Sequence, residues 1–67
     1  MLKFSERLKE LRQEKSLTQQ ALADIFNLHQ TTVKDWETKG KQPSYQTLIK
    51  LAQFFEVTTD YILGLTD

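Results

Sequence analysis

The sequence predicts an all-α protein that folds as a compact five-helix bundle, with residues 1–67 forming a single domain. Apolar residues recur every three or four positions along most of the chain, which is the period of an amphipathic helix. Strong breakers are few, because the chain holds only Gly40, Gly64 and Pro43 of these types. These breakers, together with capping residues, divide the chain into five helical segments, and no segment alternates as a strand does.

The first two helices are expected from about Lys3 to Glu14 and from Thr18 to near Phe26. The first carries apolar residues at helical spacing, namely Phe4, Leu8 and Leu11. The Thr18 hydroxyl can accept a hydrogen bond from a free amide at the start of the second helix. Leu17, just before it, can pack onto Leu22 and fix the direction in which the chain enters the helix.

The third helix is expected to begin after His29, where Leu28 can pack onto Val33 in the same way. Histidine is a poorer cap than serine, threonine or aspartate, so we expect this helix start to fray slightly. Gly40 suits the left-handed residue that closes the helix.

The fourth helix is expected after Ser44, and the fifth after Thr58, both of which are good caps. The fourth has a broad apolar stripe and is expected to be the most buried element; the stripe contains Leu48, Ile49, Leu51, Ala52 and Phe55. In the fifth, Val57 can pack onto Ile62, and Gly64 ends the helix.

The second and third helices have the spacing of a helix-turn-helix motif. If Gln19 is the first position, Ala23 is the fifth, Asn27 the ninth, Val33 the fifteenth and Trp36 the eighteenth. A small residue lets two steeply crossing helices approach, and asparagine tolerates the left-handed backbone of a sharp turn. The two last positions face the core, so the opposite face of the third helix is free to enter a DNA groove.

Composition excludes several classes of protein. There is no cysteine and only one histidine, so disulfides, a zinc site and a Cys–His pair are ruled out, and we expect no metal or cofactor. The residue types and spacings supply no nucleophile with a base and an orienting group, so we expect no enzyme activity. No segment approaches the roughly 20 apolar residues that span a bilayer, and the first residues do not resemble a signal peptide. We therefore expect a cytoplasmic protein.

The net charge is zero, although a DNA-binding protein is usually basic. The charges are unevenly distributed, however. Residues 1–50 hold all nine basic residues and six acidic ones, whereas residues 51–67 hold three acidic residues and no basic one. The chain is therefore expected to have a basic end that could face phosphates and an acidic end that faces away.

These residues together resemble the lambda-repressor-like helix-turn-helix domains of phage Cro and repressor proteins, also called XRE-type regulators. The likeness runs from Phe4 to Leu65 and rests on five stretches of sequence: Arg7-Leu8-Lys9-Glu10-Leu11-Arg12, Leu17-Thr18-Gln19 with Ala21-Leu22-Ala23, Thr32-Val33-Lys34-Asp35-Trp36-Glu37, Lys41-Gln42-Pro43-Ser44 and Tyr61-Ile62-Leu63-Gly64. The chain departs from the family at Ser16 and Asn27, where glycine is frequent, and at His29, where serine or threonine is usual. The resemblance implies a double-stranded DNA partner and a transcriptional regulator, most often a repressor.

The outer face of the third helix supplies the candidates for reading bases, which are Gln30, Thr31, Lys34 and Asp35. Glutamine can bond bidentately to adenine, the threonine methyl can touch thymine, and lysine can donate to guanine. Asp35 has two interpretations. It accepts from cytosine, or it is a surface aspartate neutralised by Lys34 or Lys39.

The resemblance implies that Gln19 clamps a DNA phosphate at the start of the second helix, where helix amides also favour an anion. Lys39 and Lys41 lie where the family commonly contacts the DNA backbone, and Thr32 could add a hydroxyl. The alternative for each of these residues is simple solvation. Arg12 and Lys15 are weaker candidates of the same kind, and His29 is expected to be an exposed turn residue.

Phe54 and Phe55 are adjacent in the fourth helix and cannot share one face, so one of them is expected at the surface. A dimer patch is predicted from four apolar residues: Phe54, Tyr61, Leu63 and Leu65. The predicted function is a sequence-specific regulator that binds an inverted-repeat operator as a homodimer. The alternative is a protein-interaction module that uses the same fold without binding DNA.

Overall fold

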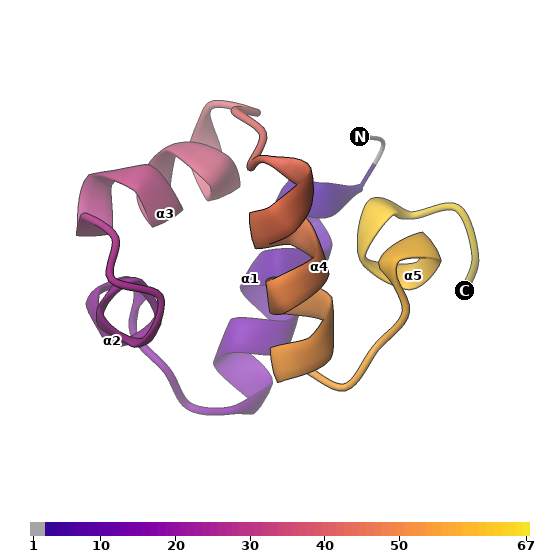
Figure 1. Cartoon of the computed structure of the whole chain (residues 1–67), viewed down its shortest axis with the longest axis horizontal. Helices are drawn as coiled ribbons and strands as arrows, with labels where there is room; N and C mark the ends of the chain where they lie inside the picture. The colour runs from indigo at the N-terminus through magenta and orange to yellow at the C-terminus, as the bar shows by residue number, and fades with distance from the viewer. Residues whose placement is uncertain (1–2) are drawn as a thin grey trace.

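The computed structural model describes residues 3–67 and confirms the all-α class, with five helices and no strand in that range (Figure 1). The helices are α1 (Phe4–Glu14), α2 (Gln19–Ile25), α3 (Gln30–Thr38), α4 (Tyr45–Phe54) and α5 (Thr59–Leu63). Figure 1 shows α1 and α4 at the centre, α2 and α3 on one side, and α5 on the other. The expected bounds agree with these to within about a residue; residues 1 and 2 of the predicted domain lie outside the described residues.

Four of the helices, α1, α2, α4 and α5, end in the same hydrogen-bonded turn. In each, a left-handed residue is followed by an apolar one whose amide donates to a carbonyl five residues back. The left-handed residues are Ser16, Asn27, Glu56 and Gly64. The donor–acceptor pairs are Leu17–Arg12, Leu28–Ala23, Val57–Ala52 and Leu65–Asp60, at 2.8–3.0 Å. The left-handed positions at Ser16 and Asn27 were expected from the resemblance, but Glu56 was not.

Three of these apolar residues also lie just before the start of the next helix. Leu17, Leu28 and Val57 pack against the core immediately before the N-caps of α2, α3 and α5. The hydroxyls of Thr18 and Thr58 each accept a backbone amide at 3.0 Å, as predicted. Ser44 does the same for α4 at 3.2 Å. The His29 side chain makes no cap hydrogen bond, so α3 has the weakest start of these four helices.

The core is one cluster to which all five helices contribute: Phe4, Leu8, Leu11, Leu22, Ala23, Val33, Trp36, Leu48, Leu51, Ala52, Phe55 and Ile62. Phe4 and Trp36 pack edge to face, with their ring centroids 6.2 Å apart. The predicted apolar stripe of α4 is wrong at one residue, because Ile49 is 47% exposed. Its position on the helix is one turn beyond Tyr45, on the side that turns away from the core.

Arg7 fastens the C-terminal end of the chain to α1. Its guanidinium donates to the backbone carbonyls of Tyr61 and Thr66 and lies 4.2 Å from the centre of the Tyr61 ring. The amide of Lys3 also donates to the carbonyl of Leu63 at 3.2 Å. None of the helices formed by residues 3–67 is long and apolar enough to cross a membrane.

Candidate nucleic-acid interface

The predicted helix-turn-helix is formed by α2 and α3. Ala23 is fully buried where the two helices meet, and Asn27 adopts a left-handed backbone (φ 56°) in the turn between them. Val33 and Trp36 point into the core, as their spacing predicted. The opposite face of α3 is left on the surface of the molecule, where it could lie against a nucleic acid.

Three of the four candidate base-reading residues lie at this surface. Thr31 and Lys34 are exposed, and Gln30 is half-buried at the first turn of α3. The exposed residue Thr38 donates its hydroxyl proton to the carbonyl of Lys34 at 2.8 Å, so this side chain is turned back onto its own helix. These three candidates therefore share one accessible helix face.

Asp35 does not share that face. It is buried, in contrast to the surface position expected of it, and its carboxylate lies 3.7 Å from the Lys39 Nζ and 3.5 Å from the Lys41 Nζ. The neutralising partners are thus Lys39, as expected, and Lys41 rather than Lys34. Its Oδ1 atom has no hydrogen-bond partner among residues 3–67. A carboxylate in this position lies close to two lysine ammonium groups and does not project outward.

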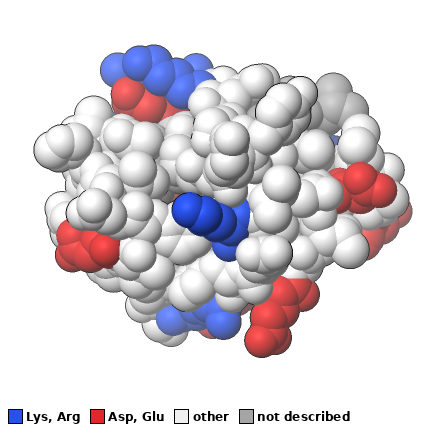
Figure 2. All heavy atoms as spheres, viewed as in Figure 1, with Lys and Arg blue, Asp and Glu red and all other residues white. Residues whose placement is uncertain are grey.

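The candidate phosphate-binding residues are arranged around the same face. Gln19 and Thr32 are half-buried near the starts of α2 and α3, and Lys39 and Lys41 are exposed at the end of α3. Figure 2 shows that basic atoms over α3 and the loop after it lie directly beside acidic atoms, whereas acidic atoms dominate the α5 side. The positive charge near α3 is therefore partly compensated, and its field is weaker than the lysines alone would produce.

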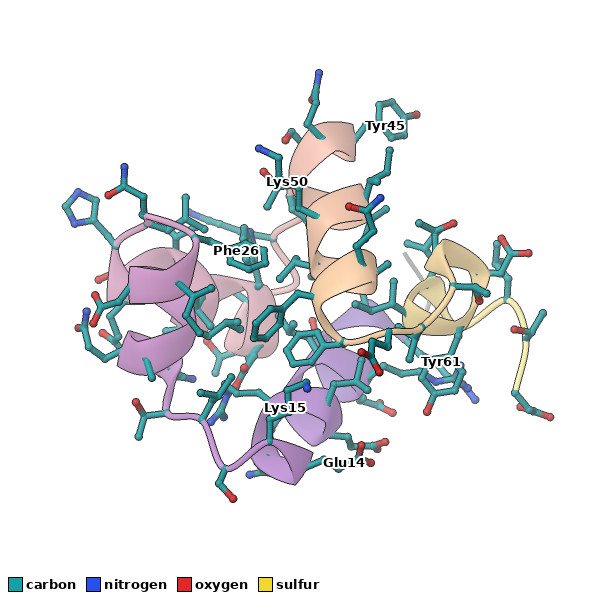
Figure 3. The ribbon with its side chains drawn as sticks, turned by 60° about the horizontal axis from the view of Figure 1, so that its bottom comes forward. Glu14, Lys15, Phe26, Tyr45, Lys50 and Tyr61 are labelled. Atoms are coloured by element: carbon teal, nitrogen blue, oxygen red, sulfur yellow. The ribbon has the colours of Figure 1, made fainter. Side chains whose placement is uncertain are left out.

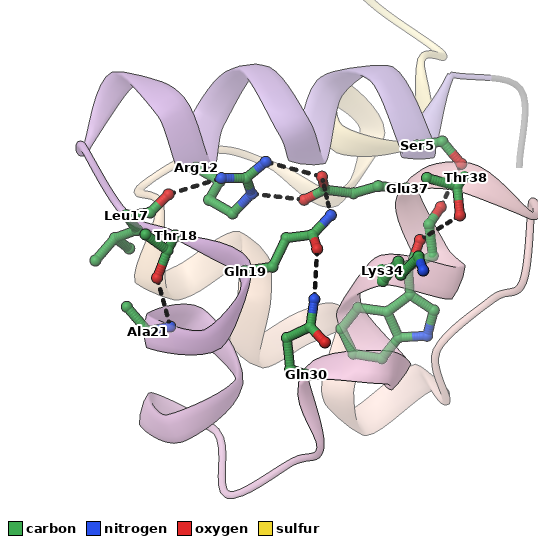
Figure 4. A network of polar contacts seen from close by, with 11 residues as sticks. Ser5, Arg12, Leu17, Thr18, Gln19, Ala21, Gln30, Lys34, Glu37 and Thr38 are labelled. Atoms are coloured by element: carbon green, nitrogen blue, oxygen red, sulfur yellow. Dashed lines mark hydrogen bonds and ion pairs between the residues drawn. The ribbon is translucent and has the colours of Figure 1, made fainter.

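A chain of polar contacts links α1, α3 and α2 behind this surface (Figure 4). Arg12 bonds Glu37 bidentately, with Nε–Oε2 at 2.7 Å and Nη2–Oε1 at 2.9 Å. Gln19 Nε2 donates to Glu37 Oε1 at 3.2 Å, and Gln30 Nε2 donates to Gln19 Oε1 at 2.7 Å. We call these four residues the amide relay. Two residues predicted for different roles, Gln19 and Gln30, are thereby brought into direct contact.

The sequence analysis missed Glu37 and expected a different environment for Arg12. Arg12 was expected to be a weak surface candidate, but it is buried, and the Glu37 side chain is only 1% exposed. The hydrogen bond to Glu37 raises the pKa of Arg12 above its usual value, because it stabilises the charged guanidinium. A usable signal was present, because Arg12 lies one turn from Leu8, and Glu37 one turn from Val33, on the apolar faces of their helices.

The four residues of the predicted dimer patch do not form one surface. Phe54 packs edge to face on Phe26, with 5.7 Å between ring centroids, and Phe55 is the buried one of the adjacent pair. Figure 3 shows Phe26 within the helix-turn-helix, with Tyr61 at a distance from it on α5. Tyr61 is covered on one side by Arg7.

Leu63 and Leu65 line a separate hollow of about 530 Å³, together with Gln42, Pro43, Ser44, Tyr45 and Leu48. Tyr45 is 83% exposed and Leu65 is 61% exposed. Figure 3 shows Tyr45 projecting from the first turn of α4 into solvent. We call the seven residues that line this hollow the α4–α5 surface. Another hollow, of about 570 Å³, lies between the end of α2 and α4 and includes Ile25 and Phe54.

The fold and the α2–α3 geometry define a helix-turn-helix protein. Comparison with known families agrees, since the family model described as helix-turn-helix matches residues 8–62. The chain belongs to this family, whose XRE-type members the sequence already resembled. Residues 3–67 bring together no cluster of three or more side chains suited to holding a metal ion.

Similar proteins carry names of the same kind. The chain is 36% identical over 64 residues to the uncharacterized HTH-type transcriptional regulator YobD of Bacillus subtilis, covering 96% of this chain and 57% of that protein. It is 35% identical to the HTH-type transcriptional regulator ImmR of the same organism, over 94% of this chain and 50% of ImmR. The HTH-type transcriptional activator BcrR of Enterococcus faecalis is 36% identical, over 94% and 31% respectively. The chain thus spans about half the length, or less, of these relatives, and their names indicate regulators rather than enzymes.

Proposed function

We propose that this protein is a sequence-specific double-stranded DNA-binding transcriptional regulator that places α3 in the major groove. The observation that carries the proposal is the amide relay, which holds Gln30 at the accessible start of α3 through Gln19. A side chain that must discriminate between bases needs such a fixed orientation, because an amide that rotates freely can pair with several base edges.

In this proposal Gln30 pairs with adenine, Thr31 packs its methyl group against a thymine methyl, and Lys34 donates to guanine. Asp35 has a different role. Its burial and its pairing with Lys39 and Lys41 favour restraint of these two lysines over direct contact with cytosine. The base-reading set therefore contains three residues of the outer face of α3.

Gln19, Thr32, Lys39 and Lys41 are proposed to bind DNA phosphates. Gln19 uses its carbonyl oxygen and one amide hydrogen within the relay and retains a second hydrogen for a phosphate. The two lysines flank the end of α3 and keep their ammonium groups largely in solvent. Contacts of this kind fix the register of the protein on DNA and do not select a sequence.

We further propose that the protein binds an inverted repeat as a homodimer, with half-sites about one helical turn apart. The α4–α5 surface supports this, because Tyr45 and Leu65 expose apolar area that a second copy could cover. Leu63 of the predicted patch stays in the proposed contact, and Phe54 and Tyr61 do not, because they lie on other surfaces.

We propose repression as the outcome, because a protein bound over a promoter can exclude polymerase without making any further contact. The relative BcrR is named an activator, which makes a promoter–reporter assay the necessary measurement of the sign. The named relatives are bacterial, and we propose that this protein acts on DNA in the cytoplasm of a bacterium, encoded by its chromosome or by a phage.

The first experiment is selection of binding sites from a randomised duplex pool, followed by affinity measurements across salt concentrations. We expect an inverted repeat, and log affinity that falls with log salt at a slope of about −0.9 per phosphate contacted. Gln30→Ala should relax one base position at a cost of about 1–3 kcal/mol, whereas Lys41→Ala should weaken all duplexes alike. No enrichment at low salt with folded protein would exclude the proposal and favour the protein-interaction module.

A further inference from the structure

The hydrogen-bond directions in the amide relay are set by the residue at its buried end. Glu37 is bidentate to Arg12, with N–O distances of 2.7 and 2.9 Å, and an ionised carboxylate in such a pair can only accept hydrogen bonds. The Gln19 amide must therefore turn its NH₂ group toward Glu37, at 3.2 Å. Arg12 also donates to the carbonyl of Leu17 at 2.7 Å, which ties the buried pair to the start of the motif.

The orientation of the Gln19 amide in turn fixes the orientation of the Gln30 amide at the surface. With its NH₂ group on Glu37, Gln19 presents its Oε1 atom to Gln30, which can be satisfied only by a donor. Gln30 Nε2 supplies that donor at 2.7 Å. Gln30 is left with its Oε1 atom and one N–H for any partner in the groove. Two side chains that are 10% and 1% exposed, those of Arg12 and Glu37, thus determine which atoms of Gln30 are left for DNA.

We propose that Arg12 and Glu37 are positioning residues that fix the amide polarity of Gln30 and so make it select adenine over guanine. This inference rests on the proposed function, because it concerns the same base-reading residue. One acceptor and one donor match the N6 amino group and N7 of adenine. The reverse polarity would present two N–H groups instead, which match the O6 and N7 acceptors of guanine.

Glu37→Gln tests the proposal, because the new side chain keeps an oxygen for Arg12 but gains an NH₂ group. That group can donate to Gln19 Oε1 and reverse the direction of each amide in the relay. The measurement is the ratio of dissociation constants for two duplexes that differ by adenine or guanine at the Gln30 position. We expect the preference for adenine to fall about tenfold or more.

A matched control separates positioning from loss of stability. Ile62→Val removes one methylene from a fully buried side chain in α5, outside the relay, and should leave the adenine-to-guanine ratio unchanged. If Ile62→Val and Glu37→Gln change the ratio equally, Glu37 has only a structural role. Should Glu37→Gln fail to fold, Gln19→Met interrupts the relay at a half-buried residue and leaves both members of the Arg12–Glu37 ion pair in place. It should lower the same ratio, since Gln30 is then free to rotate.

The two proposals fail in different ways. If Gln30→Ala loses the adenine preference while Glu37→Gln and Gln19→Met both retain it, the positioning role is overturned and the proposed reading by Gln30 stands. A retained preference in Gln30→Ala would instead remove Gln30 from the base-reading set, and the relay with it.

Discussion

The amide relay and the α4–α5 surface differ in how firmly their side chains are held. In the relay, two charged and two amide side chains are held by hydrogen bonds of 2.7–3.2 Å, and the Glu37 side chain is 1% exposed. In the α4–α5 surface, Tyr45 and Leu65 are 83% and 61% exposed, and neither side chain has a hydrogen bond or ion pair within residues 3–67. Directional polar contacts set the orientation of a few atoms, whereas exposed apolar area is suited to non-directional burial.

The difference indicates that the amide relay and the α4–α5 surface are suited to different tasks. A buried ion pair adds little net stability compared with apolar side chains of the same volume, so its value lies in the geometry that it imposes. An exposed apolar patch also adds no stability to the monomer. Under the proposed function, both regions give up stability for recognition, one for recognition of bases and the other for contact with a second copy of the protein.

Arg12→Met should have the largest effect, because it leaves the Glu37 carboxylate buried without its partner. We expect a loss of about 3–5 kcal/mol in the free energy of unfolding, measured by urea denaturation, which is a large part of the stability of such a small domain. The double variant Arg12→Met/Glu37→Met should recover most of this loss but lack the adenine preference, because no carboxylate is left to orient Gln19. Equal stability of Arg12→Met and the parent protein would contradict the buried pair described here.

Replacing each of the two glycines by alanine compares the chain after α3 with the chain after α5. Gly40 follows α3 and Gly64 follows α5, and both have left-handed backbones, at φ 68° and 84°. Gly40→Ala meets open space and should cost about 1 kcal/mol for the backbone alone. Gly64→Ala places its Cβ 2.6 Å from the Lys3 Cβ and should cost about 2 kcal/mol or more.

The measurement is the urea midpoint of each glycine variant with unchanged dependence on denaturant concentration. Equal midpoints for the two alanine variants would show that α5 and Lys3 can separate without cost. The α4–α5 end would then be looser than its packing indicates.

Leu65→Glu should weaken self-association at the α4–α5 surface. A charge at this exposed apolar position must be desolvated when a second copy covers it, so we expect the dissociation constant of the proposed dimer to rise about tenfold. Sedimentation equilibrium at several concentrations measures this change. Ile25→Glu places the same charge at a 50% exposed residue of the other hollow and should have no effect on association. Equal effects of both variants would point to association without a defined surface.

Most of the fold was predictable because local rules agreed with one another. Thr18, Ser44 and Thr58 are favourable caps and do cap their helices, and Gly64 closes α5 as expected. Glu56 was not predicted to be left-handed, since glutamate has no intrinsic preference for that backbone. Glu56 adopts the left-handed backbone because the turn after α4 requires it, with the Val57 amide donating to the Ala52 carbonyl.

The candidate site was less predictable, because a helical wheel gives the face of a residue but not its partners. It placed Gln30, Thr31 and Lys34 correctly at the surface of α3. It could not show that Arg12 and Glu37 meet, since they are 25 residues apart in sequence and on different helices. Opposite charges on two apolar faces were the available signal, and only the packing of α1 on α3 turned it into a contact.

The smallest expected effect concerns the start of α3. Among α2 to α5, only α3 lacks a side-chain cap, and His29 already has the extended backbone that a capping residue needs. His29→Ser should therefore add about 0.5 kcal/mol to the free energy of unfolding without moving the helix. Amide hydrogen exchange in the first turn of α3 should slow in proportion, and Thr58→Ala should produce the opposite change at α5. If His29→Ser slows exchange but leaves the base profile unchanged, the relay alone orients Gln30; a sharper profile would mean that fraying of this turn also limits discrimination.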